Sequence, residues 1–325
     1  MGEVLSNERR IDTHHHIVVP AYRDWVSKRG ISAGGLAIPQ WDVDTDLAFM
    51  DCQHIQTSIL SVSTPGTHLG DDAEALKWAR RVNDYAAEVT KSRPDRFGFF
   101  ATLPLPYLDG ALNEATRALD ELNADGIVLY TNYHGIYLGA PVFEPLMVEL
   151  GRRGTVVFIH PSELPAGGLP AVPAGIADFL LDSVRAATYL TLTDTPARYP
   201  KIKFILSHGG GFLPYAAHRI AQLAPVLADT PPRMDGDSIL TRLRHFYFDT
   251  ALAANRDTFP SLLAFADPRK LIFGSDFPYA NAEVSSYFTT QLDEYPLPEG
   301  QRFAINRGNA EVLFPRLVAN NGSGR

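Results

Sequence analysis

Cysteine is nearly absent from this chain, which has 325 residues and a single thiol at Cys52. One thiol cannot form an internal disulfide or build the thiolate cluster of a typical structural zinc site. The chain also lacks an apolar run of the roughly 20 residues that a transmembrane helix needs. Its opening residues, MGEVLSNERR, lack the apolar core of a secretory signal. Together these absences predict a cytoplasmic protein that does not enter a membrane.

The chain has fewer positive than negative charges, since it contains 29 Lys and Arg residues and 37 Asp and Glu residues, which gives a formal net charge of −8. Such a chain has no basic field to attract nucleic-acid phosphates or an anionic bilayer. Nucleic acid is therefore not an expected partner. What is present is an ordinary globular composition, with 45% hydrophobic and 20% charged residues, which supports a large core.

Eight short β-branched or aromatic segments alternate with stretches of helical periodicity, which is the pattern of βαβ units and a parallel sheet. The expected strands are residues 11–14, 57–62, 97–102, 126–129, 155–160, 202–207, 246–250 and 271–275. The expected helices are residues 71–90, 110–122, 141–152, 177–193, 215–227, 256–266 and 284–295. This order predicts an α/β protein with one domain over residues 1–325, a (β/α)₈ TIM barrel. Residues 17–46 are expected to form an insertion over the barrel mouth, and residues 318–325 a frayed polar tail.

Two histidines at the end of the first expected strand are the first candidates for a metal site. In IDTHHHIVV, His14 and His16 leave the strand on one side and His15 on the other, because strand side chains alternate. Barrel active sites are built at the carboxyl ends of the strands. A His-x-His pair at that edge suits zinc or a similar divalent ion.

Three further expected strands end in a titratable side chain. The fifth ends at His160 in VVFIHPSE, the sixth at His208 in KFILSHGGG and the eighth at Asp276 in LIFGSDFPY. Any one of them could serve an ordinary structural purpose, such as a hydrogen bond or a helix cap. A barrel gathers all these strand ends around one axis, so their conjunction with the His-x-His pair predicts a functional site at the mouth.

Other histidines and aromatic residues have weaker signals. His68 follows the second expected strand in STPGTHLGDD, so it faces the mouth and could contact a substrate. Tyr22 and Trp25 of the insertion could wall a substrate pocket or simply pack in the core. The histidines away from strand ends are expected to be structural: His54, His134, His218 and His245.

The motifs IDTHHH, FIHP, LSHGGG and FGSDFP resemble the amidohydrolase superfamily, in the branch of aminocarboxymuconate semialdehyde decarboxylase and the salicylate-type decarboxylases of 6-methylsalicylate and γ-resorcylate. RVNDYAAEV, SRPDRFGFFATLPL and RGNAEVLF extend the resemblance from Arg10 to Phe314. It implies that His208 is a catalytic acid/base and that one divalent ion is held by His14, His16, His160 and Asp276. Zinc is the first expectation for that ion and manganese the second, with no organic cofactor.

Departures from the family pattern narrow the expected number of metal ions and the expected class of substrate. The fourth strand ends in Leu129, Tyr130 and Thr131, without the carboxylated lysine of dinuclear members, so one metal is expected. Arg219 matches the arginine by which the muconate decarboxylases reach the substrate carboxylate of a neighbouring subunit, which implies a homodimer. The second carboxylate-binding arginine of those enzymes has no counterpart in GGLAIPQW, and SVSTPGTHLGDD is closer to the salicylate-type enzymes.

The function expected from these features is non-oxidative decarboxylation of a small hydroxybenzoate-type or related unsaturated carboxylic acid. Asp276 or His208 would deliver the proton to the ring carbon. The alternative is a hydrolase, in which the same ion activates a water for attack on a lactone or amide and Asp276 takes the proton. A third possibility is a metal-binding module without turnover. The sequence does not separate the first two, because both need the same metal ligands.

Overall fold

The computed structural model describes residues 9–169, 171–229 and 233–319. Its main sheet has eight parallel strands in the order β1-β2-β3-β4-β7-β8-β9-β10. Their bounds are Arg10–His16 (β1), Ile55–Ser61 (β2), Phe97–Thr102 (β3), Gly126–Tyr130 (β4), Val156–His160 (β7), Lys203–Leu206 (β8), Tyr247–Asp249 (β9) and Leu271–Ile272 (β10). The amide of Thr13 donates to the carbonyl of Phe273, and His15 bridges Phe277 in parallel, so the chain returns to its first strand after the last. The expected (β/α)₈ barrel is confirmed.

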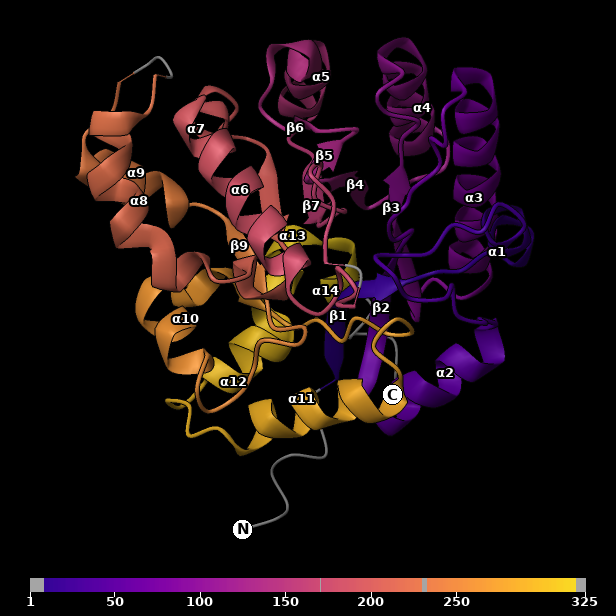
Figure 1. Cartoon of the computed structure of the whole chain (residues 1–325). Helices are drawn as coiled ribbons and strands as arrows, with labels where there is room; N and C mark the ends of the chain where they lie inside the picture. Colours follow the sequence, from indigo (N-terminus) through magenta and orange to yellow (C-terminus); the bar gives the residue numbers. More distant parts are fainter. Residues whose placement is uncertain (1–8, 170, 230–232, 320–325) are drawn as a thin grey trace.

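Helices follow the strands and surround them (Figure 1). The main helices between successive strands are α2 (Val43–Cys52), α3 (Asp72–Ser92), α4 (Leu108–Asp120), α5 (Glu144–Arg153), α6 (Asp178–Leu192), α8 (Leu213–Leu227) and α10 (Phe259–Phe265), and α11 (Ala282–Glu294) follows the last strand. Further helices are α1 (Pro20–Ser27), α7 (Thr195–Arg198), α9 (Gly236–Leu243), α12 (Gln301–Phe303), a π-helical turn (Ala304–Gly308), α13 (Asn309–Leu313) and α14 (Arg316–Ala319). Short 3₁₀ turns lie at Pro141–Phe143, His208–Gly210 and Pro268–Lys270, and a small hairpin pairs β5 (Asn132–Tyr133) with β6 (Ile136–Tyr137). Within the described ranges, no helix combines the length and apolar character required to cross a membrane.

Among the differences from the elements expected from the sequence, two concern the insertion and the tail. Helix α2, which precedes β2, begins at Val43, inside the expected insertion, because Asp42 caps it by accepting from the Thr45 amide at 2.8 Å. Acidic residues in VDTDLAFMDC mask its narrow buried face in the sequence. Residues 318 and 319 of the expected tail belong to α14, which buried Leu317 holds against the barrel. The rest of that tail, residues 320–325, lies outside the described residues.

An apolar cluster fills the interior of the barrel and closes one end of it. The cluster takes at least one buried side chain from each of the eight strands and continues into Phe314 and Leu317 of the C-terminal segment. That segment lies at the start of β1, where the Arg307 guanidinium donates to the carbonyl of Arg9 at 2.8 Å. The amino-terminal end of the barrel is therefore packed shut, and the carboxyl-terminal end is left for a site.

A register irregularity in β1 decides which side chains face the barrel interior. The pairing of β1 with β2 shifts between Asp12 and His15. Strict alternation would place Ile11 and His14 on opposite faces, yet Ile11 belongs to the interior cluster and the His14 ring lies 4.9 Å from the interior Phe158 ring. The bulge lets one strand contribute both to the core and to the site above it.

Candidate active site

Four of the side chains singled out in the sequence meet at the carboxyl ends of the strands. His14 Nε2 lies 3.1 Å from His16 Nε2 and 3.2 Å from Asp276 Oδ1. His16 Nε2 lies 3.1 Å from the same oxygen. With His160 they form a buried group in which one ligand atom from each residue lies within 4.8 Å of all the others. Strands β1 and β7 and the segment after β10 supply them, so only the closed barrel brings them together.

The outer nitrogen of each of the three imidazoles is held by an oxygen. His14 Nδ1 lies 2.7 Å from Asp249 Oδ2, His16 Nδ1 lies 3.2 Å from the carbonyl of Ser61, and His160 Nδ1 lies 2.8 Å from the carbonyl of Pro161. Carbonyl and carboxylate oxygens accept, so each Nδ1 carries a proton and each Nε2 faces the centre of the group, where a neutral ring offers its lone pair. This is the arrangement by which outer partners orient histidine ligands of metal ions.

Burial and neighbouring charge shift the pKa of every member of the group. Burial alone lowers the pKa of His14, but the carboxylates of Asp249 and Asp276 raise it to about 10. Burial lowers the pKa of His16, and burial with the positive charge of neighbouring histidines lowers that of His160 well below its usual value. Burial alone raises the pKa of Asp276, but the histidines around it, His14 foremost, lower it well below the usual value.

The chemistry of this donor set fits one divalent cation. Inward-facing lone pairs on three imidazoles repel one another unless a proton or a cation lies between them. Three imidazole nitrogens and one carboxylate oxygen suit zinc and other first-row divalent ions. Beside the group, His208 Nε2 lies 3.3 Å from Asp276 Oδ2, while its buried Nδ1 has no hydrogen-bond partner among the described residues. His208 thus has a free nitrogen with which to take or give a proton.

The backbone holds His208 and Asp276 in the left-handed region. Their φ angles are +54° and +61°, a conformation that costs a residue with a side chain about 1–2 kcal/mol. The strain is offset by fixed hydrogen bonds, because the His208 amide donates to Asp249 Oδ1 and the Asp276 amide to the carbonyl of His14, each at 2.8 Å. Such strained residues cluster at functional sites, where they aim a side chain.

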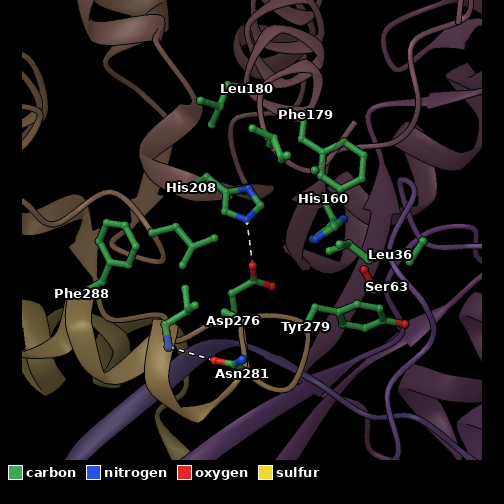
Figure 2. Close-up of a pocket in the computed structure, with 16 residues that line it drawn as sticks. Leu36, Ser63, His160, Phe179, Leu180, His208, Asp276, Tyr279, Asn281 and Phe288 are labelled. Atoms are coloured by element: carbon green, nitrogen blue, oxygen red, sulfur yellow. Dashed lines mark hydrogen bonds and ion pairs between the residues drawn. The ribbon is translucent and has the colours of Figure 1, made fainter. Parts of the chain in front are cut away.

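A cavity of about 470 Å³ opens above the group, and His160, His208 and Asp276 form part of its lining. Figure 2 shows Asp276 between His208 and Tyr279, with Phe179 on the far side of His160. Most of the other lining side chains are apolar. The volume and the few convergent polar groups are those of a small-molecule site.

The remaining sequence candidates lie away from this cavity's lining. Tyr22 is buried and donates its hydroxyl to the carbonyl of Gly66, and Trp25 stacks on Trp78. His68 lines a separate cavity of about 320 Å³, where its Nδ1 lies 3.1 Å from His134 Nε2. Arg219 is exposed on α8. For these four residues substrate contact stays a prediction.

The structure adds residues that the sequence analysis missed. Asp249 joins His14 to the His208 backbone. The available signal was a polar residue near the end of the apolar segment FYFDT, residues 246–250. On the opposite face of β1, His15 lies between Asp12 Oδ2 at 2.9 Å and Asp46 Oδ1 at 2.7 Å. Trp41 donates to Asp46, which ties the insertion to the strand that carries His14. No local pattern marks Asp12 or Asp46, because their partner is set by the fold.

Comparisons with known proteins identify the family to which the chain belongs. The model of the Amidohydrolase family matches residues 11–316. The chain is 39% identical to the decarboxylase yanB of Aspergillus niger over 95% of this chain and 88% of that one. It is 38% identical to the 6-methylsalicylic acid decarboxylase of Penicillium expansum over 95% of this chain and 97% of that one. A solved structure of an amidohydrolase II superposes with a TM-score of 0.87 at 31% identity, covering 94% of this chain and 99% of that one. The chain therefore belongs to the amidohydrolase family.

Proposed function

We propose that this protein is a metal-dependent, non-oxidative decarboxylase of a small aromatic carboxylic acid of the hydroxybenzoate type. The single observation that carries the proposal is the oriented His/Asp group with a free acid/base, His208, at the floor of an apolar cavity. The relatives named above, which cover nearly the whole chain, support decarboxylation over other amidohydrolase reactions. The enzyme needs no organic cofactor in this scheme.

His14, His16, His160 and Asp276 are the residues that would hold the metal ion. When bound, a divalent ion there would supply a Lewis-acid charge that attracts the carboxylate of the substrate. Asp249 keeps the tautomer of His14 that presents Nε2 to that position. Zinc is the proposed ion and manganese the second choice, because both accept imidazole and carboxylate ligands.

The protein's own residues then move one proton. His208 or Asp276 delivers it to the ring carbon that carries the carboxylate. As the bond between that carbon and the carboxylate breaks, its electron pair returns to the ring, which keeps the new C–H bond and releases CO₂. The 3.3 Å contact between His208 Nε2 and Asp276 Oδ2 makes the two groups one proton-holding unit. The mostly apolar lining of the cavity is a poor solvent for the charged substrate, which favours the loss of neutral CO₂.

The test is turnover of the metal-loaded protein with a panel of hydroxybenzoic acids and, in parallel, of lactones and amides. Release of labelled CO₂ from a carboxyl-labelled acid supports the decarboxylase. Ring opening of a lactone or cleavage of an amide without CO₂ would replace it by the hydrolase. Unfolding on metal removal, with no turnover of any compound, would favour a metal-binding module without catalysis. Loading with zinc or manganese in separate samples assigns the ion.

We further propose a homodimer in which Arg219 of one subunit faces the partner's site. The exposed helix α8 supports this proposal, because Arg219 shares it with the exposed side chains of Tyr215, Val226 and Leu227. Apolar patches of this kind mark interaction surfaces. Light scattering of the purified protein measures the oligomeric state, and Arg219→Ala is expected to raise the KM of the carboxylate substrate. A cytoplasmic location stays a prediction.

A further inference from the structure

The cavity above the His/Asp group has a lining that restricts the substrate. Among the described residues that line it there is no arginine and no lysine. Within one subunit, the carboxylate of a substrate therefore has its charge partner only at the floor, where the His/Asp group would hold the metal ion. A second carboxylate higher in the cavity would be buried without a cation from its own subunit, which is strongly unfavourable. The lining instead favours one carboxylate and an apolar substituent on the ring.

A tight turn from the insertion meets the loop before α6 at one wall of this cavity. Ala33 and Leu36 pair across the turn, each amide donating to the other's carbonyl at 2.9–3.0 Å, and both side chains line the cavity. Gly34 and Gly35 between them have φ angles of +57° and +86°, the left-handed geometry of a type I′ turn. The carbonyl of Gly34 accepts from the Gly175 amide at 3.2 Å, which joins the turn to the loop.

Gly34 also leaves the space into which the Phe179 ring fits. A Cβ at Gly34 would lie 2.2 Å from Phe179 Cζ, so any side chain there displaces the ring. The Phe179 ring in turn stands edge-on to His160, with ring centroids 6.0 Å apart at 78°. Figure 2 shows this ring beyond His160, on the side of the cavity away from Tyr279. The position of one cavity wall thus depends on a missing side chain in the insertion.

We propose that Gly34 and Phe179 form a specificity wall that sets the largest apolar ring substituent an aromatic monocarboxylic acid can carry. The inference rests on the proposed decarboxylase function, whose site it refines. Phe179 is seated by Gly34 and meets the face of the substrate ring or its substituent. Gly34 acts through Phe179 and is a positioning residue.

The experiment compares Gly34→Ala with a control that has the same backbone strain. Gly30 lies in the same insertion with a φ of +66°, and a Cβ there meets nothing within 4 Å. Gly30→Ala therefore reproduces the cost of a left-handed alanine without touching Phe179. Phe179→Leu and the double variant Gly34→Ala/Phe179→Leu complete the set. The ligands are salicylate and its 6-methyl, 6-ethyl and 6-propyl derivatives, with 2,6-dihydroxybenzoate and isophthalate as polar and dicarboxylate probes.

The measured quantities are kcat/KM for each acid and, independently of turnover, its Kd by calorimetry with the metal-loaded protein. Gly34→Ala is expected to weaken the 6-propyl acid relative to salicylate by about 10-fold or more, the effect of a methylene or two in a tight pocket. Gly30→Ala is expected to keep the wild-type ratio. Phe179→Leu is expected to shift the preference toward larger substituents, and the double variant to follow Phe179→Leu.

Either of two results would refute the proposed specificity wall. One is an equal ratio of 6-propyl acid to salicylate in Gly34→Ala and Gly30→Ala, and the other is an unchanged size preference in Phe179→Leu. Tight binding of isophthalate by the Arg219→Ala protein, in which a partner subunit offers no arginine either, would overturn the restriction to one carboxylate. If the wild-type protein binds the acids but decarboxylates none, the proposed function fails. In that case the Kd ratios alone support or refute the wall.

Discussion

Replacement of Asp249 by asparagine tests whether Asp249 orients the metal ligand His14, because the His14 side chain itself stays in place. Asparagine has nearly the same shape, and its oxygen can still accept from the amides of His208 and Ala251, which lie 2.8 and 3.1 Å from Asp249 Oδ1. The side-chain nitrogen, however, then faces His14 Nδ1 in place of the carboxylate oxygen that lies there at 2.7 Å. Two donors cannot share that contact, so His14 is expected to move its proton to Nε2. The nitrogen that faces His16 and Asp276 then no longer offers a lone pair.

The expected loss of metal affinity is about 10- to 100-fold, the usual effect of removing such an outer partner. This corresponds to about 1.4–2.7 kcal/mol of binding free energy. Affinity is measured by competition with a chromophoric chelator, and circular dichroism checks the fold. Asp182→Asn is the matched control, because Asp182 is also a buried carboxylate with several donors but does not contact His14. An Asp249→Asn protein that binds metal as tightly as the control would refute the orienting role.

Four further results are expected. His208→Asn should lower kcat by about 10²- to 10⁴-fold and leave the metal content, measured by mass spectrometry, unchanged, because His208 is outside the four-residue group; loss of metal with activity would place it among the ligands. Removing metal with a chelator should abolish turnover, and zinc or manganese should restore it; full activity in the chelated protein would exclude metal dependence. In metal-free protein, burial lowers the pKa of His15, but the carboxylates of Asp46 and Asp12 raise it by more, from 6.5 to about 10. Charged His15 then stabilises the fold fully below pH 6.5, so the melting temperature should fall as pH rises toward 10, and a rise would contradict this sign. Phe158→Ala should lower the free energy of unfolding in urea by about 3–5 kcal/mol, since that buried ring supports His14; a change below 1 kcal/mol would show that the barrel interior relaxes around the gap.

Local sequence patterns predicted the barrel and the positions of the ligand candidates because each pattern has a local physical cause. Apolar runs such as VVFIH mark strands covered on both faces, and a polar residue at the end of such a run reaches the mouth of a parallel barrel. His160 and His208 were visible in this way. The start of α2 was not, because its short buried face is hidden among acidic residues.

The sequence by itself determined the order of strands and helices and the chemical types available at the strand ends, since periodicity and residue chemistry act between near neighbours. Tertiary structure alone decided which partners those side chains have. Asp249 faces His14 across 235 positions of chain, and Asp46 faces His15 from the insertion. The packing of the Phe179 ring against Gly34 likewise depends on two segments that meet only in the folded barrel. Such contacts depend on distances through space, and no spacing along the chain encodes them.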